Sequence, residues 1–378
     1  MKVLLIGGTG ILSTDVCLYA LSKGMTVYCI NRGLRKDKLP KGAHLIVANI
    51  RNQEDVLQKV AGLKFDVIVD FLSYTPKQLK QSLSVFSEKC DQYVFISTAV
   101  AYCKESEDDI ITEDFSLGND KWLYGKNKAD CEALLKKACK SSGLSYTIVR
   151  PYVTYGDTRI PFGITSDKSS WSLANRILTG KPIVLWDSGK AICTLTHTRD
   201  FAVAMVGLFK NPCASCQAYH ITSNERLTWK DVLEKIEAAL NKRAVIIDMP
   251  TSKVESYMTE YRGILSGDKA TNMRFDNSKI CAAVPEFKAN IDFKTGIQQT
   301  IDFFLSNRTA RKIDYVWDGR LDRMIEKYSK KHPLSIDQKT LEMRCFDADD
   351  FSKKNELDYR IGRNAFLYNC NRILNKIR

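Results

Sequence analysis

The stretch Val3–Thr14, VLLIGGTGILST, places three glycines between an apolar run and the start of an amphipathic segment. This pattern predicts a strand, a short turn and a helix. Gly7 can form the tight turn, and Gly10 lets the backbone approach a pyrophosphate closely, while Ser13 takes the third small position, where helix and strand pack. Because the N–H groups at the start of a helix favour an anion, the stretch predicts a dinucleotide-binding turn. A purely structural turn is the alternative.

The first half of the chain alternates short apolar segments with longer amphipathic ones. Strands are expected over residues 2–8, 26–33, 43–50, 65–74, 92–102 and 145–156. Helices are expected over residues 13–24, 52–62, 76–89 and 125–143. Strand–helix alternation predicts a parallel sheet with helices on both faces, and the Val- and Ile-rich strands suit burial on both sides. The predicted fold class is α/β, with a Rossmann-like doubly wound parallel sheet.

The pattern loosens after Gly156, where helices and short strands are mixed. Helices are expected over residues 169–180 and 228–242, and strands over residues 181–187, 218–223 and 243–250. We therefore expect a dinucleotide-binding domain over residues 1–155 and a smaller α/β C-terminal substrate lobe over residues 156–305, interleaved with the first. Residues 306–378 are expected to form a basic, mostly helical C-terminal extension.

The composition suits a folded protein with anionic partners. The formal net charge is +13, which fits nucleic acid, phosphorylated cofactors or nucleotide substrates. No run of about 20 apolar residues and no signal peptide is found, so no membrane partner is expected. Twelve cysteines without an export signal indicate reduced thiols and a cytoplasmic location. The pair Cys213 and Cys216 has no second ligand pair, so no metal site is expected.

The end of the second predicted strand bears on the choice of cofactor. An Asp or Glu at this point would bind the ribose 2′-hydroxyl of NAD. The sequence has Asn31 and Arg32 instead, and an arginine can accommodate a 2′-phosphate. The cofactor is therefore NAD or NADP, with NADP favoured by Arg32; the alternative is that Arg32 stacks on adenine.

A tyrosine and a lysine stand four residues apart in YGKNK, residues 124–128. On a helix this spacing puts Tyr124 and Lys128 on one face. Many helices carry such a pair, so its meaning depends on what surrounds it. Here it follows several strand–helix alternations and a dinucleotide turn, which favours an acid/base site.

Taken together, these motifs resemble the extended short-chain dehydrogenase/reductase family, the NAD-dependent epimerase/dehydratase group. The matching segments occur in the family's order: GGTGILS, ANI, VFISTAVAY, YGKNK, RPYVTYGD and HTRDFA. The resemblance covers residues 1 to about 305, and the combination is more specific than any single motif. The tail after about residue 330 has no counterpart in the family.

The resemblance implies a mechanism that elementary electrostatics supports. Tyr124 would be the acid/base, although a free tyrosine has a pKa near 10. The ammonium of Lys128 and the positive nicotinamide would stabilise its phenolate, and Lys128 would also hold the nicotinamide ribose. Thr98 would hydrogen-bond the reacting hydroxyl or carbonyl. The alternative for Thr98 and its neighbour Ser97 is that they are ordinary hydroxyls at a strand end.

The resemblance also implies a set of cofactor-binding residues. They come from the glycine turn, the ends of the following strands and the Tyr–Lys helix: Gly7, Thr9, Gly10, Ile11, Leu12, Asn31, Arg32, Asn49, Ile50, Phe71, Leu72, Tyr124, Lys128 and Pro151.

Two departures from the family narrow the activity. Ala99 and Val100 stand where dehydratases and decarboxylases carry acidic residues, which disfavours both reactions and leaves an epimerase or a reductase. Cys193 stands where nucleotide-sugar epimerases have an arginine that binds the substrate diphosphate. A thiol cannot replace the paired hydrogen-bond donors of a guanidinium group. The expected substrate is therefore a sugar-like hydroxyl compound, with a nucleotide sugar implied by the family alone.

A third departure introduces a rival from another class. The segments INRG and DFLSY, the second with Phe71 and Leu72, resemble a divergent branch that includes chloroplast RNA-binding relatives. No interleaved aromatic–basic platform for RNA is found, and the retained Tyr124, Lys128 and Thr98 favour an enzyme. A non-catalytic or RNA-binding role and a homodimer are left open.

Overall fold

The computed structural model describes residues 1–104, 106–333, 340 and 352–377. The chain divides into two compact units, and each is described by itself. The first unit comprises residues 1–156, 193–226 and 272–293; the second comprises residues 157–192, 227–271 and the described part of 294–378. The expected domains over residues 1–155, 156–305 and 306–378 stay predictions beside this division.

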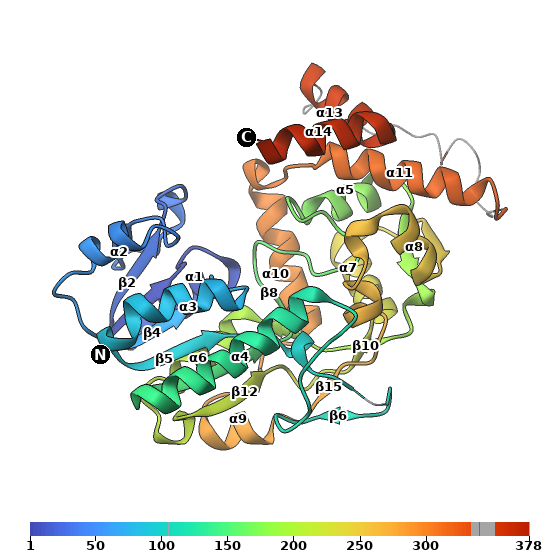
Figure 1. Cartoon of the computed structure of the whole chain (residues 1–378). Helices are drawn as coiled ribbons and strands as arrows, with labels where there is room; N and C mark the ends of the chain where they lie inside the picture. The colour runs from blue at the N-terminus through green and yellow to red at the C-terminus, as the bar shows by residue number, and fades with distance from the viewer. Residues whose placement is uncertain (105, 334–339, 341–351, 378) are drawn as a thin grey trace. The chain divides into compact units, whose positions relative to one another are not determined.

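The first unit is built on a seven-stranded sheet (Figure 1). Every pairing in it is parallel, in the order β12-β7-β5-β4-β1-β2-β3. The strands are β1 (Lys2–Ile6), β2 (Thr26–Asn31), β3 (His44–Val47), β4 (Phe65–Asp70), β5 (Cys90–Ile96), β7 (Ser145–Pro151) and β12 (Gln217–Ile221). The order runs outward in both directions from β1 and β4, which confirms the predicted doubly wound, Rossmann-like class.

Helices cover both faces of this sheet. They are α1 (Ile11–Ser22), α2 (Gln53–Lys59), α3 (Pro76–Phe86), α4 (Leu123–Ser142), α6 (Thr198–Gly207) and α9 (Ser278–Ala283). Val3 and Leu5 of β1 share a buried cluster with residues of α1, α6 and α9, whereas Leu4 and Ile6 share one with α2, α3 and α4. Successive strand residues point to opposite faces, so a strand buried on both sides is apolar throughout.

Several strands end earlier than their apolar runs. The strand expected over residues 145–156 is wrong as a single element, because it breaks into β7 and β8 (Val153–Tyr155). Pro151 lacks the N–H that would continue the ladder, and β8 pairs instead with β11 (Leu195–His197). The remaining short strands are β6 (Ile110–Ile111), β10 (Ile192–Cys193), β13 (Leu227–Thr228) and β15 (Arg274–Phe275).

Gly8 is confined by the second strand. Its φ is +74°, and a Cβ atom at this position would lie 2.6 Å from both Cβ and Sγ of Cys29. Gly24 has nearly the same backbone, with φ +73°, but nothing lies within 4 Å of its ideal Cβ. A substitution at Gly24 therefore introduces backbone strain alone, whereas one at Gly8 adds steric overlap with Cys29.

We expect Gly8→Ala to lower stability by about 1–3 kcal/mol more than Gly24→Ala, because overpacking adds to the left-handed strain that both share. Thermal unfolding of the two variants beside the wild type measures this difference. Equal shifts in the melting temperature of the two variants would show that the turn accommodates the new methyl group beside Cys29 without further loss of stability.

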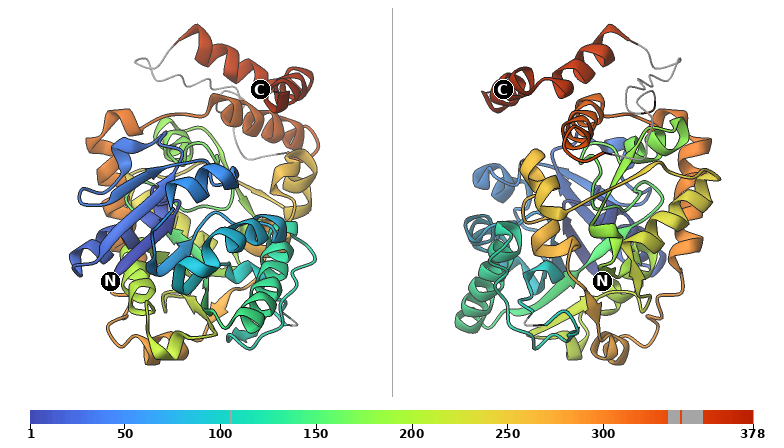
Figure 2. Two further views of the ribbon diagram at one scale, coloured as in Figure 1. Left: turned by 60° about the vertical axis from the view of Figure 1, so that its left-hand side comes forward. Right: turned by 90° about the vertical axis from the view of Figure 1, so that its right-hand side faces the viewer.

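The second unit is mainly helical. It contains the parallel pair β9 (Ile183–Trp186) and β14 (Ile246–Met249). Its helices are α5 (Trp171–Thr179), α7 (Trp229–Leu240), α8 (Thr251–Tyr257), α10 (Phe293–Ser306), α11 (Tyr315–Ser329), α13 (Lys353–Arg363) and α14 (Ala365–Ile377). Helix α13 packs along α11 (Figure 2). Helices α11, α13 and α14 confirm the predicted helical C-terminal extension in its described part, and residues 334–339, 341–351 and 378 lie outside the described residues.

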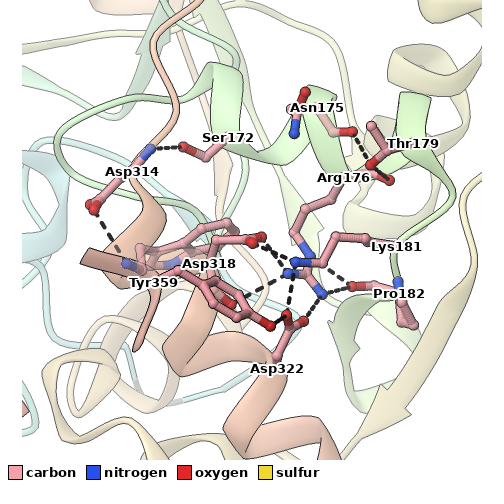
Figure 3. Close-up of polar contacts among 11 residues, drawn as sticks. Ser172, Asn175, Arg176, Thr179, Lys181, Pro182, Asp314, Asp318, Asp322 and Tyr359 are labelled. Atoms are coloured by element: carbon pink, nitrogen blue, oxygen red, sulfur yellow. Dashed lines mark hydrogen bonds and ion pairs between the residues drawn. The ribbon is translucent and has the colours of Figure 1, made fainter. Parts of the chain in front are cut away.

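A buried ion cluster joins α5 to α11 (Figure 3). Arg176 donates to Asp318 at 2.5 Å and to Asp322 at 2.7 Å, and Lys181 pairs with the same two carboxylates. Asp318 and Asp322 are one helical turn apart, so both face the cations. The hydroxyl of Tyr359 on α13 donates to Asp322 at 2.8 Å. Burial alone would raise the pKa of Asp322, but Arg176 and Lys181 outweigh it and lower that pKa.

No helix in the described part of the chain combines the length and the hydropathy needed to cross a bilayer.

Candidate active site

A cleft of about 700 Å³ opens in the first unit, beside the carboxyl ends of β1, β2, β4 and β5. This edge is where ligands bind in open parallel sheets. Every residue predicted to bind the cofactor lies on its lining. The full set is Gly7, Thr9, Gly10, Ile11, Leu12, Ser13, Asn31, Arg32, Leu34, Arg35, Ala48, Asn49, Ile50, Arg51, Phe71, Leu72, Tyr74, Ile96, Ser97, Tyr124, Lys128 and Pro151.

The glycine turn presents the start of α1 to this cleft. The N–H of Gly10 donates to Oγ of Ser13 at 2.9 Å, so Ser13 caps the helix as well as packing beneath it. The first turn of α1 carries no acidic residue. No acidic side chain in this first turn therefore neutralises the positive end of the helix dipole. The dipole and the N–H groups of the turn suit an anion such as a pyrophosphate.

Three arginines line the cleft near the ends of β2 and β3. Arg32 and Arg35 follow β2, and Arg51 follows β3 and donates to the carbonyl oxygen of Leu72 at 2.7 Å. Asn31 accepts from the N–H of Gly33 at 2.8 Å, which shapes the turn carrying Arg32. No Asp or Glu is among the lining residues. Sequence reasoning singled out Arg32 only; Arg35 and Arg51 lie in loops, where no periodicity marks them.

Asp70 shapes the loop after β4 that carries Phe71, Leu72 and Tyr74. Its buried carboxylate accepts from the N–H groups of Leu72 and Ser73 at 2.8 and 3.0 Å. It also accepts from the hydroxyls of Ser73 at 2.6 Å and Tyr93 at 2.7 Å. The sequence analysis missed this role; the signal was a carboxylate directly after the apolar residues Val67, Ile68 and Val69.

Lys128 lies on α4 and lines the cleft. Its ammonium donates to the carbonyl oxygens of Ser73 at 2.7 Å and Ile96 at 2.6 Å. Nζ also lies 4.9 Å from the ring centroid of Tyr74 and 4.7 Å from that of Phe95. Burial lowers the pKa of Lys128 to about 8, against the opposing attraction of Asp70. The ammonium is thus mostly retained at neutral pH and titrates within the working range of an enzyme.

Tyr124 stands one turn before Lys128, as the helical spacing predicts. Its ring lies 5.0 Å from that of Trp122 and 6.5 Å from that of Tyr74, centroid to centroid. Gly125 brings α4 against the preceding loop, since a Cβ there would lie 2.7 Å from the carbonyl oxygen of Val100. This close approach holds Tyr124 beside the end of β5.

The hydroxyls at the end of β5 have separate surroundings. Ser97, not Thr98, is on the cleft lining. Oγ of Ser97 donates to Glu132 at 2.6 Å, and Glu132 forms a buried ion pair with Arg150 at 2.6 Å. Oγ1 of Thr98 accepts from the N–H of Val100 at 3.3 Å, at the start of a short 3-10 helix. Thr98 is one residue from the cleft, and its catalytic role stays a prediction.

Cys193 and the CxxC pair behave differently in the structure. The side chain of Cys193 is fully buried, whereas Cys213 and Cys216 are exposed thiols. Within the described ranges, no group of three or more His, Cys, Asp or Glu side chains is placed to hold a metal ion.

The doubly wound sheet, the glycine turn and the Tyr–Lys helix define a dinucleotide-binding α/β protein of the Rossmann type. The chain belongs to the NAD dependent epimerase/dehydratase family, whose sequence model matches residues 3–221.

Two characterised relatives differ in the roles that their names give. The chain is 25% identical over 245 residues to the chloroplast stem-loop binding protein of 41 kDa b of Arabidopsis thaliana. That match covers 60% of this chain and 60% of the relative, so it spans less than two thirds of the relative's length. The chain is 23% identical over 250 residues to 2′-dehydrokanamycin reductase of Streptomyces kanamyceticus, covering 66% and 70% of the two chains.

A solved structure with the same fold is UDP-glucose 4-epimerase of Thermus thermophilus in complex with NAD. The TM-score is 0.67 at 20% identity, covering 81% of this chain and 99% of the epimerase. At this identity the likeness concerns the fold, and it agrees with the sheet order and helical layers described above.

Proposed function

We propose that the protein is an NAD(P)-dependent oxidoreductase or epimerase acting on a sugar-like hydroxyl group. The observation that carries the proposal is the cleft itself. It gathers the glycine turn, Tyr124 and Lys128 at the carboxyl edge of the parallel sheet. Membership of the NAD dependent epimerase/dehydratase family supports the same reading.

The bound nicotinamide would supply a carbon that accepts or returns a hydride. The first turn of α1 would hold its pyrophosphate, and Asn49 and Ile50 would lie beside adenine. Arg32 and Arg35, with Arg51 nearby, would pair with a 2′-phosphate. The absence of carboxylates from the cleft lining supports a phosphorylated dinucleotide, so NADP is favoured over NAD.

Tyr124 would move the proton of the reacting hydroxyl, with Lys128 as the fixed positive charge that makes its phenolate accessible. Lys128 is held by two carbonyl oxygens and two aromatic faces, which supports this electrostatic role. Thr98 would offer its hydroxyl to the substrate oxygen. Trp122 and Tyr74 would flank the reacting group.

The substrate is proposed to be sugar-like, without requiring a nucleotide diphosphate. The residue that would clamp a diphosphate in nucleotide-sugar epimerases is Cys193 here, and it is buried. The similarity to a reductase supports net reduction as well as epimerisation.

Cofactor choice can be tested by binding measurements. Arg32→Ala combined with Arg35→Ala should weaken NADP binding by about 10- to 100-fold, since each change removes a charged hydrogen-bond donor from a phosphate. NAD binding should hardly change. Isothermal titration calorimetry of both dinucleotides measures this, with Lys38→Ala, an exposed lysine of the same loop that is off the cleft lining, as the control. Tighter binding of NAD than of NADP to the wild type, unaffected by the arginine changes, would overturn the preference.

A second candidate function is binding of an RNA stem-loop, which the similarity to the Arabidopsis protein and the net charge of +13 favour. Phosphate-driven binding would make the logarithm of the affinity fall linearly with the logarithm of salt concentration. Filter binding of a labelled stem-loop at several salt concentrations, with and without NADP, tests it. Affinity that follows salt and ignores NADP would support this candidate.

A further inference from the structure

Helix α14 carries an apolar stripe at helical spacing. Its members recur every three to four residues along one side: Phe366, Leu367, Cys370, Ile373 and Leu374. The other side of the helix carries asparagines, Tyr368 and Arg372. This sequence describes a strongly amphipathic helix, which in a globular protein normally turns its apolar face to the core.

In helix α14 the apolar side is exposed instead of buried. Phe366 is 74% exposed, Leu367 41%, Ile373 59% and Leu374 61%. On the polar side, the ring centroid of Tyr368 lies 4.1 Å from the guanidinium carbon of Arg320 on α11. Four large apolar side chains therefore project away from the body that carries the helix, which is uncommon for an exposed surface.

The elements beneath α14 hold this orientation. α13 and α11 touch backbone to backbone, since a Cβ on Gly319 or Gly362 would lie 2.4 or 2.2 Å from a carbonyl oxygen of the facing helix. Arg363 at the end of α13 pairs with Glu326 of α11 at 2.7 Å. Asn364 then accepts from the N–H of Phe366 at 2.9 Å and starts α14 directly (Figure 1). A linker of one residue leaves little freedom to turn the helix over.

The charge of α13 and α14 is mainly positive: residues 352–377 contain six Lys and Arg residues against Glu356 and Asp358. Residues 365–377 contain Arg372 and Lys376 and no Asp or Glu. Lys353 and Lys354 add two exposed cations at the start of α13. A second copy of the chain would bring like charges together, whereas an anionic surface would be attracted.

We propose that α14 binds an anionic lipid surface, with its axis in the plane of the bilayer and its apolar stripe inserted below the headgroups. An outward apolar face with Phe and Leu, a cationic polar face and low net hydrophobicity is the combination that interfacial helices share. Such a helix needs no spanning segment, so the proposal agrees with the lack of one in the described chain. It is independent of the proposed enzymatic function, because it uses no residue of the cleft.

Vesicle co-sedimentation of the full chain tests the proposal. Wild-type protein should bind phosphatidylcholine vesicles containing about one third phosphatidylserine, and raised salt should weaken that binding. Phe366→Ser combined with Ile373→Ser should lower the partition coefficient at least about tenfold, since two large apolar side chains no longer insert. Arg372→Glu should lower it several-fold on the mixed vesicles.

The matched control is Leu57→Ser combined with Leu305→Ser, which removes two aliphatic side chains of 45% and 48% exposure elsewhere and should leave partitioning unchanged. All variants alter exposed positions, so unchanged circular dichroism confirms their folding. Equal binding of wild type to vesicles with and without phosphatidylserine would overturn the proposal, as would undiminished binding of the α14 variant. It would also be overturned by a wild-type dimer in sedimentation equilibrium that the α14 changes dissociate, with no vesicle binding; the stripe would then be an interface between copies.

Discussion

Tyr124→Phe should lower turnover by about 10²–10⁴-fold, the usual range when a positioned acid/base is removed. The change deletes one hydroxyl from the cleft and keeps the ring between Trp122 and Tyr74. Dinucleotide affinity should therefore stay close to that of the wild type. Absorbance of the reduced nicotinamide, followed with a panel of sugars and nucleotide sugars, measures turnover, and calorimetry measures the affinity.

Tyr19→Phe is a suitable control, because it deletes a tyrosine hydroxyl from α1 away from the cleft lining. The pH profile gives a second readout. Burial lowers the pKa of Lys128 to about 8, so its positive charge is present below that pH and lost above it. In the wild type, kcat/KM should accordingly fall as the pH rises through about 8. Full turnover by Tyr124→Phe would show that another group moves the proton.

Arg176→Met should destabilise the second unit by about 3–5 kcal/mol, because it leaves two buried carboxylates facing one lysine. Arg176, Lys181, Asp318 and Asp322 are all buried, and the two aspartates tie α11 to α5. Denaturation by urea, followed by circular dichroism and by the fluorescence of the buried tryptophans, measures the change. Limited proteolysis should show the C-terminal helices cleaved earlier than in the wild type.

Two further variants separate the ion cluster from a general effect of losing charge. Lys330→Met removes a cation from an exposed pair with Glu326 and should change the free energy of unfolding by less than about 1 kcal/mol. Arg176→Met combined with Asp318→Asn restores the charge balance, so it should be less destabilising than the sum of the two single changes. A loss below about 1 kcal/mol for Arg176→Met would contradict the anchoring role of the cluster.

The sheet was predictable because its central strands, β1, β4 and β5, are buried on both faces and its helices on one. Mostly apolar segments such as β4, followed by the amphipathic α3, indicate a parallel α/β layer without knowledge of distant contacts. The strand ends were predicted too far downstream. Phe71 and Leu72 extend an apolar run, but they line a cleft instead of the sheet, and hydropathy does not distinguish these two environments.

The residues of the candidate site could be predicted where they belong to one short motif, but not where separate loops bring them together. The glycine turn and the Tyr124–Lys128 spacing are local features. Arg35 and Arg51 reach the cleft through the turns that follow β2 and β3, and Asp70 at the end of β4 shapes the next loop, so their proximity follows from the sheet order. The ion cluster around Arg176 joins residues more than 140 positions apart. No spacing rule connects such residues before the fold is known.

Native mass spectrometry of the purified protein, mixed separately with NAD and NADP, tests the central claim most directly. One dinucleotide bound per chain is the predicted result, with NADP retained at higher collision energy than NAD because of the arginines around the cleft. If neither dinucleotide binds at millimolar concentration, about the upper end of the usual KM range, the cleft at the glycine turn is not a cofactor site and the proposed enzyme is wrong.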